Sequence, residues 1–308
     1  MKNLFKIFTL SISLLLVAGI SYAQNVLVDA NKSYSNIKSI EVNGGWLDVT
    51  YEGGSGSEVN VEAYLESNET NQDIVFVTLG DVLKISYERS KNNYSWNSKN
   101  KGYIKITGPK EIALQLRNSS GSMMVNNVSN DETLLKVTSG KISASTIAGN
   151  LDIQATSGSL KIDGVKGDVI AGLTSGNADI YNVSGNVQYK STSGSLDAEN
   201  INGEINISLT SGNARLNNIG SLGTLKFTSG NIKAENAGLG DHTSFEGSSG
   251  NFKVQTPSNL KAFNFSLKAS SGNVKVGGIS SGKSLEMDNG SDAWVKGSIT
   301  SGNITIEN

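Results

Sequence analysis

The sequence predicts an all-β fold, a single-stranded parallel β-solenoid (β-helix) with coils of about 18 residues, and three observations point to it. A Thr/Ser-Ser-Gly tripeptide recurs at a regular interval, and apolar and polar residues alternate on both sides of it. Glycine is abundant and proline nearly absent, with 35 and 2 residues in a chain of 308. Such a period is typical of stacked units that share one core. By analogy we expect a right-handed coil.

Residues 1–23 have the parts of a secretory signal peptide. Two lysines precede an apolar run from Ile7 to Ile20, and Ser21-Tyr22-Ala23 is a small-x-small cleavage site. The run is short for a membrane-spanning helix, which needs about 20 residues. We therefore expect cleavage near Ala23/Gln24 and a mature chain with no transmembrane segment. It would be exported beyond the inner membrane, to the periplasm, the outer-membrane surface or the medium.

The composition argues against several classes of protein. The net charge is −2 and only three of the 26 basic residues are arginine, so nothing favours nucleic-acid binding. The chain has no cysteine, which excludes disulfides, thiolate metal sites, a cysteine nucleophile and a lipid-modified N-terminal cysteine. With a single histidine, His242, only carboxylates are left as plausible metal ligands. We expect no metal site and no cofactor.

Residues 24–110 are β-prone but lack the repeat. Glycine-containing turns separate the segments that we expect as strands: 39–42, 46–51, 59–65, 74–78, 82–87 and 103–107. Terminal coils of a solenoid are irregular because they must cover the stack. We interpret this region as the N-terminal coils and cap of the same solenoid, with a separate domain as the alternative.

The regular solenoid is expected to occupy residues 111–308. The repeat glycines stand at positions 121, 140, 158, 176, 194, 212, 230, 250, 272 and 302. The copies from Gly140 to Gly230 are 18 residues apart, and Gly290 is interpreted as a degenerate copy. Glycine adopts positive φ at no steric cost and asparagine tolerates it. The tripeptide is therefore read as the corner of each coil, with side-chain ladders of Asn, Ser and Thr along the turns, and not as a ligand motif.

Residues around each corner fall into columns. Apolar residues lie two, four and seven positions after the glycine and three and five before it, and charged residues occupy the positions between. This alternation is typical of strands with one buried face. We expect Leu196 and Leu216 to be buried and Asp197 to point outward, beside an outward row of threonines that includes Thr156 and Thr174.

Repeated Thr-Ser-Gly-Asn and Thr-Ser-Gly-Ser turns after an irregular β start resemble the bacterial putative-adhesin families of Gly/Ser-repeat β-solenoids. These are akin to the putative auto-transporter adhesin head (GIN) domain, a domain of unknown function. The resemblance covers about residues 35–308. It implies an extracytoplasmic location and supplies no catalytic residues.

Two motifs imitate functional sites. Gly278-Ile279-Ser280-Ser281-Gly282 matches the nucleophile elbow, but neither a following helix nor a suitable histidine partner is evident. Residues 53–58 resemble one copy of a calcium-binding nonapeptide, which needs several copies in series. Both are interpreted as turns, so we expect no catalytic residue.

Ligand contacts are expected where the repeat is interrupted. The candidates are Tyr94 and Trp96 in the polar loop 88–101, His242 in the loop 237–247, and Trp294 in residues 286–297. Aromatic side chains can stack on a sugar or on a partner protein, although each could equally be a cap or core residue.

These observations predict an exported non-catalytic binding module, either an adhesin or an envelope-binding protein, whose partner is a glycan or an envelope or cell-surface protein. The first alternative is a carbohydrate-active enzyme like a polysaccharide lyase, which would need three or more carboxylates or Lys/Arg side chains converging in one groove. The second is a periplasmic structural scaffold. The final segment, Ile304 to Asn308, is expected to leave an open strand edge, and with it a possible dimer through the C-terminal solenoid edge.

Overall fold

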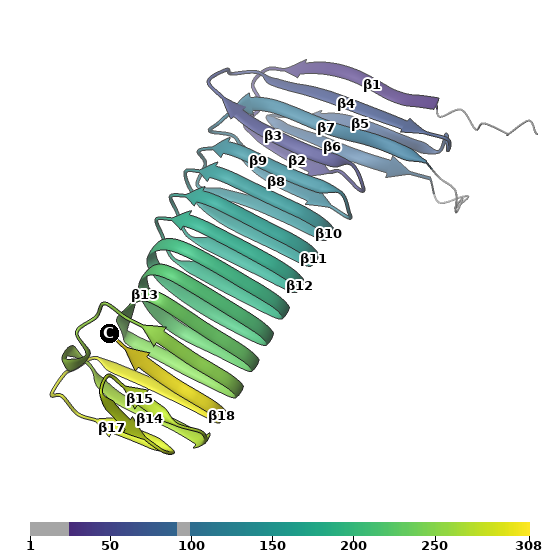
Figure 1. The fold of residues 1–308 in the computed structure, drawn as a ribbon. Coiled ribbons are helices and arrows are strands. Elements are labelled where there is room, and N and C mark those ends of the chain that lie inside the picture. The colour runs from purple at the N-terminus through teal and green to yellow at the C-terminus, as the bar shows by residue number, and fades with distance from the viewer. Residues whose placement is uncertain (1–24, 91–98) are drawn as a thin grey trace, which may run out of the picture.

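The computed structural model describes residues 25–90 and 99–308, which form a long stack of strands (Figure 1). The one helix assigned in these ranges is a short 3-10 turn, η1 (Leu260–Ala262). None of their helices is long and apolar enough to cross a membrane. The strands in these ranges are β1 (Asn25–Tyr34), β2 (Ser39–Asn43), β3 (Asp48–Gly54), β4 (Val59–Ser67), β5 (Gln72–Leu79), β6 (Val82–Arg89), β7 (Asn100–Pro109), β8 (Ala113–Asn118), β9 (Ser122–Val128), β10 (Glu132–Ile147), β11 (Asn150–Val165), β12 (Val169–Val183), β13 (Val187–Gln255), β14 (Asn264–Ser271), β15 (Val274–Val276), β16 (Ile279–Ser281), β17 (Ser284–Met287) and β18 (Trp294–Glu307).

Each regular coil is flattened and has two extended segments, one before and one after a Ser-Gly corner. In β11, buried Ile153 and Ala155 precede the corner at Gly158, and buried Leu160 and Ile162 follow it. We call the outward surface of the segments before the corners the leading face, and that of the segments after them the trailing face. The core is the thin apolar layer between the two.

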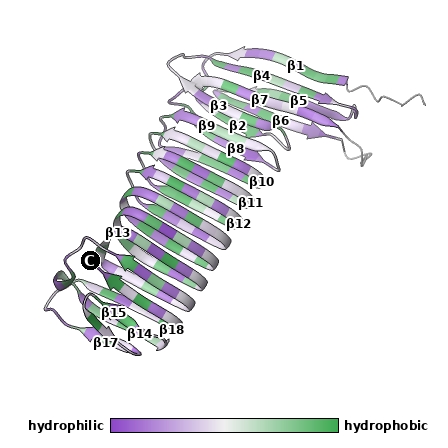
Figure 2. Ribbon diagram, viewed as in Figure 1, coloured by the Kyte–Doolittle hydropathy of each residue, from purple (hydrophilic) through white to green (hydrophobic). Residues whose placement is uncertain are grey.

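The coils stack in parallel and in register. Gly140, Gly158, Gly176 and Gly194 pair in succession, so each step along the stack is 18 residues. Figure 2 shows green and purple bands alternating along each strand. Leu196 and Leu216 are buried and the Asp197 side chain is partly exposed, which confirms the predicted orientation of the columns.

A second corner, six residues after each repeat glycine from Gly121 to Gly230, has left-handed backbone. Asn182, Asn200, Asn218 and Asn236 occupy it with φ between 50° and 59°. The amide of each asparagine from Asn200 onward donates to the side-chain oxygen of the previous one, at 2.7–3.1 Å. The sequence interpretation placed asparagine ladders only beside the Ser-Gly turns, where the structure also has one, for example Asn231 to Asn213.

Thr146 occupies this second corner in its own coil, with φ of 55°. A β-branched residue is strained in the left-handed region, by about 1–2 kcal/mol. We expect Thr146→Asn to raise the free energy of unfolding by about 1 kcal/mol, because asparagine tolerates this backbone. Urea denaturation measures the change. Thr138→Asn, at an exposed position without positive φ, is the control and should have little effect; a less stable Thr146→Asn protein would show that the corner is not strained.

At the N-terminal end the order of strands in space differs from the order in the sequence. β2 lies between β6 and β8, and β3 lies between β7 and β9, all in parallel. Antiparallel strands lie farther out: β5 on β6, and β4 followed by β1 on β7. The expected N-terminal strands are therefore present and belong to the same sheet as the repeats.

The C-terminal end has a comparable arrangement, which corrects two expectations. β18 pairs with β13 on one side and with β14 and β15 on the other, so the final strand is not an open edge. Gly302 consequently stacks between Gly250 and Gly272. Gly290 is not a stacked copy, since it lies in the turn before β18 with no other atom near the position of a Cβ. The chain leaves β13, forms the outer strands β14 to β17, and returns to complete the inner coil.

Candidate functional site

The structure separates the four residues singled out as ligand contacts. Tyr94 and Trp96 lie outside the described residues. Residues 237–247 belong to β13 and not to a loop, and they carry an exposed His242. Trp294 begins β18 and is half-buried. His242 and Trp294 each lie two residues before the pair Ser244–Lys296, which begins the ladder between β13 and β18. These two residues therefore lie on neighbouring strands, but they do not line the hollows described below.

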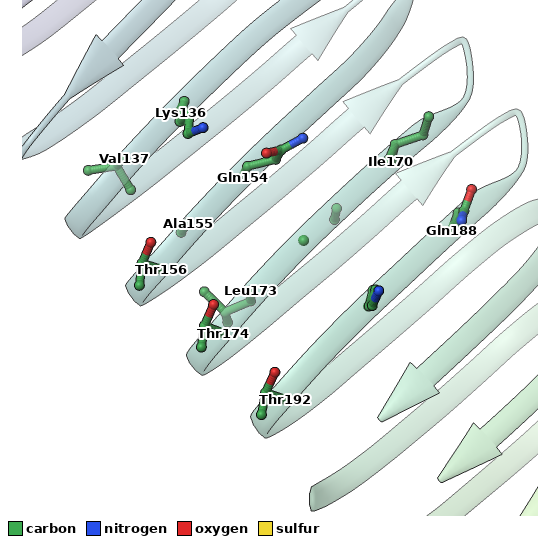
Figure 3. Close-up of a pocket in the computed structure, with 13 residues that line it drawn as sticks. Lys136, Val137, Gln154, Ala155, Thr156, Ile170, Leu173, Thr174, Gln188 and Thr192 are labelled. Carbon is green, nitrogen blue, oxygen red and sulfur yellow. The ribbon is translucent and has the colours of Figure 1, made fainter. Parts of the chain in front are cut away.

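The largest of the described hollows lies on the leading face across β10, β11, β12 and the first coil of β13, with a volume of about 420 Å³ (Figure 3). Gly172 creates it. This residue stands in a file of outward positions that carries Lys136, Gln154 and Lys190 in the neighbouring coils. Because Gly172 has no side chain, a gap opens between the long side chains on either side.

The hollow has an apolar and hydroxyl-rich lining. Figure 3 shows Thr156, Thr174 and Thr192 in a row along one side, with Ile170 and Gln188 on the other. Ile170 is 49% exposed, although most side chains of its size and chemistry in the solenoid are buried. Equivalent groups recur at the coil spacing of about 4.8 Å. The surface can therefore contact an extended chain that carries hydroxyl groups.

Lysines flank the hollow along the stack. Lys136 and Lys190 are three coils apart, which is roughly 14 Å at the spacing of paired strands. Neither ammonium forms an ion pair within the described part of the chain. Two free positive charges separated by an uncharged floor can receive carboxylates from one ligand.

The trailing face has a second, more charged hollow of about 260 Å³. Its charged and phenolic lining residues are Tyr181, Asp197, Glu199, Arg215, Lys233 and Glu235. This set meets the stated requirement for the enzyme alternative, three carboxylates and two basic groups in one hollow. Arg215 pairs with Asp197 at 3.3 Å, and Lys233 pairs with Glu235 at 2.5 Å, both on exposed side chains.

Two pKa shifts in this charged hollow, at Tyr181 and Glu235, run against those that acid–base catalysis needs. Burial, followed by the nearby carboxylates Asp179 and Asp197, raises the pKa of Tyr181. The hydrogen bond from Lys233 and its charge lower the pKa of Glu235. A tyrosine base needs a lowered pKa and a carboxylic acid a raised one. Tyr181 and Glu235 show the opposite directions, and the Arg215–Asp197 and Lys233–Glu235 ion pairs are solvent-exposed.

A third feature is an aromatic pair on the outward surface of the N-terminal strands. Tyr64 on β4 and Tyr103 on β7 are cross-strand neighbours with ring centroids 5.8 Å apart and nearly parallel planes. The Lys105 ammonium lies 4.2 Å from the Tyr103 ring centroid, and the two hydroxyls donate to Glu66 and Glu62. The two ring faces contact each other and the lysine ammonium, which favours a structural role for the pair over ligand stacking.

The sequence interpretation missed the leading-face hollow because it concentrated on breaks in the repeat. The signal lies inside the regular coils. The outward file reads Lys136, Gln154, Gly172, Lys190, so one glycine interrupts a run of long side chains. In the next file an apolar Ile170 stands at an outward position.

Comparison with known proteins gives a family and distant structural likenesses. No curated protein matches the chain. A putative adhesin from Bacteroides fragilis NCTC 9343 shares 14% identity, covering 91% of this chain and 96% of its own, with a TM-score of 0.40. A putative adhesin from Parabacteroides distasonis ATCC 8503 shares 17% identity, covering 90% and 95%, with a TM-score of 0.38. A putative lipid binding protein from the same organism shares 16% identity, covering 90% and 96%, with a TM-score of 0.28.

These similarities are too distant to transfer a ligand or a site. The Toastrack DUF4097 family model, in contrast, matches residues 37–210 and again residues 186–307. The two matches together span nearly all of the described residues and include both the irregular N-terminal strands and the regular coils. The chain belongs to the Toastrack DUF4097 family, a domain family of unknown function.

Proposed function

We propose that the protein is an exported, non-catalytic binding module of the adhesin kind, which holds an extended acidic glycan along its leading face. The observation that carries this proposal is the hollow at Gly172, with free lysines at both ends. The kinship with auto-transporter adhesin heads, inferred from the Ser-Gly turns, is part of the same proposal, as is export through the signal peptide.

An acidic glycan fits the chemistry of this face. The aliphatic side chain of Ile170 offers a contact for the apolar face of a sugar ring, and the threonine row and Gln154 offer hydrogen-bonding groups for its hydroxyls. Lys136 and Lys190 would receive carboxylates spaced along the polymer. The ligand would run parallel to the stack, because that is the direction in which equivalent groups repeat.

Filling the hollow tests the proposal. Gly172 has an unstrained backbone, and its nearest contact beyond the chain neighbours would be 3.8 Å from an added Cβ, to the Gln154 side chain. Gly172→Gln should therefore fold and weaken binding of polygalacturonate, measured by calorimetry, by about tenfold or more, the equivalent of about 1.4 kcal/mol. Ser208→Gln, two coils away in the same file and exposed, is the matched control and should bind normally.

The probe also separates the competing functions. Fully methyl-esterified polygalacturonate should bind more weakly, because it lacks the carboxylates that the lysines would receive. Cleavage of the acidic polymer, seen as ultraviolet absorbance of an unsaturated product and abolished by Tyr181→Phe, would favour the lyase alternative at the charged hollow. Equal binding by Gly172→Gln and the parent protein would refute the leading-face site. Failure of both polymers to bind would refute the proposal that the ligand is such a glycan and would favour the periplasmic scaffold.

A further inference from the structure

The strand β5 is the outermost of the strands β8, β2, β6 and β5, which continue the leading face at the N-terminal end of the stack. It pairs along its whole length with β6, and no ladder joins its other edge to another described strand. Val75, Val77 and Leu79 point outward and are 38%, 42% and 57% exposed. An edge strand of eight residues therefore presents both free backbone groups and apolar side chains.

β5 is composed like an internal strand. Its inward residues Ile74 and Phe76 are apolar, and so are three outward ones. Strands that are apolar on both faces are normally covered on both faces. From Ile74 to Leu79 the strand itself has no charged residue and no proline, and its ladder with β6 is regular. Charges, prolines and bulges are the devices that protect natural edges.

The other outer strands of the described chain do have such protection. β1, at the edge of the trailing sheet, carries exposed Asp29, Asn31 and Lys32 and has a register shift near Val28. At the opposite end of the stack, β16 and β17 contain three and four residues. Among the described outer strands, β5 therefore has no charge, proline or bulge of its own from Ile74 onward, although the Lys32 ammonium of β1 lies 4.5 Å from the Phe76 ring centroid.

We propose that β5 pairs antiparallel with β5 of a second copy of this chain, and so joins two solenoids end to end about a two-fold axis. Charge favours a second copy as the occupant. The strand has one charged residue, Asp73, near its start. A two-fold axis near Phe76 places the two Asp73 carboxylates at opposite ends of the strand pair, so these two carboxylates do not meet. It also places Val75 of one copy opposite Val77 of the other, which buries both apolar side chains.

The expected dimer is weak. A pair of eight-residue strands is small beside stable interfaces, which bury about 1,200–2,000 Å² in total. Association should therefore depend on concentration. The dimer would double the length of the rod and leave the leading-face hollow of each copy open, because that hollow begins at β10.

Sedimentation of the purified chain tests the proposal through a charge placed on the edge. Val77→Lys changes an exposed residue and should leave the melting temperature unchanged, but its association should be at least about tenfold weaker than that of the parent. Met124→Lys is the control, since Met124 is also exposed, at 52%, but lies on β9. It should associate like the parent. A parent that stays monomeric at the highest accessible concentration, or a Val77→Lys protein that associates as strongly, would overturn the proposal.

Disulfide trapping tests the pairing itself, since the chain has no cysteine of its own. An equimolar mixture of Val75→Cys and Val77→Cys proteins should form a mixed disulfide dimer under mild oxidation. A Met124→Cys protein should not cross-link at a comparable rate. Efficient cross-linking of the Met124→Cys protein, with none of the β5 mixture, would place the contact elsewhere.

Discussion

Replacing Gly194 with alanine is expected to lower the free energy of unfolding by about 4 kcal/mol. Gly194 has φ of 144°, a conformation that side chains rarely adopt, and an added Cβ would overlap the carbonyl oxygen of Gly176 in the coil below. Strained backbone costs about 1–3 kcal/mol, and forcing packed groups apart costs about 1–3 kcal/mol more. Urea denaturation followed by far-ultraviolet circular dichroism measures the loss.

Gly172→Ala is the matched control for Gly194→Ala. Gly172 is one coil away in the same solenoid, has no positive φ, and has room for a Cβ. Its replacement should leave stability unchanged or raise it by less than about 1 kcal/mol. If both variants unfold at the same denaturant concentration as the parent, the repeat glycines are not required for close stacking of the corners.

Phe252→Ala should destabilise the protein by about 4 kcal/mol, within the range of about 3–5 kcal/mol for buried phenylalanine. Phe252 is 1% exposed, and its ring centroid lies 4.5 Å from that of Phe227 and 5.1 Å from that of Phe245. The three rings lie where the regular coils meet the C-terminal strands. Removing the central ring leaves a cavity that two adjoining coils cannot close.

Lys253→Ala provides the comparison for Phe252→Ala, because Lys253 is the next residue and is exposed. Its effect on the melting midpoint should be small, within about 0.5 kcal/mol. A Phe252→Ala protein as stable as Lys253→Ala would mean that the aromatic cluster does not hold the two parts of the stack together.

The regular coils could be predicted because the residue pattern that determines each coil lies within that coil. Alternation fixes which side chains face the core, and a repeated glycine fixes the corners, so Leu196 and Leu216 were correctly expected inside. Once one coil is specified, stacking in register places every other coil. Each position is set by residues within its own repeat.

The two ends could not be predicted, because their order depends on pairing between distant segments. β18 pairs with β13 across 52 positions, and β2 pairs with β8 across 74. In both cases the two paired inner strands are separated in the sequence by a segment that includes outer strands. The strand pattern of residues 304–306 does not reveal this, since an internal parallel strand and an edge strand can have the same alternation.

The candidate site was missed for a different reason. Sequence reasoning looked for aromatic residues outside the repeat, whereas the hollow arises from a missing side chain within it, at Gly172. The apolar residue beside it, Ile170, looks unremarkable until the outward file is aligned across the coils. On a surface made of repeats, a candidate binding site is indicated where the side chain at one outward position differs in size from its equivalents in the neighbouring coils.

Hydroxyl-radical footprinting of the chain with and without polygalacturonate shows whether the polymer covers the leading-face hollow. Ile170, Met124 and Ile279 are similarly exposed, at 49%, 52% and 52%, and lie in different parts of the stack. We expect the polymer to reduce oxidation of Ile170 and to leave oxidation of Met124 and Ile279 unchanged. Bound polymer that leaves Ile170 as reactive as before, or that protects Met124 or Ile279 instead, would contradict a glycan site on the leading face.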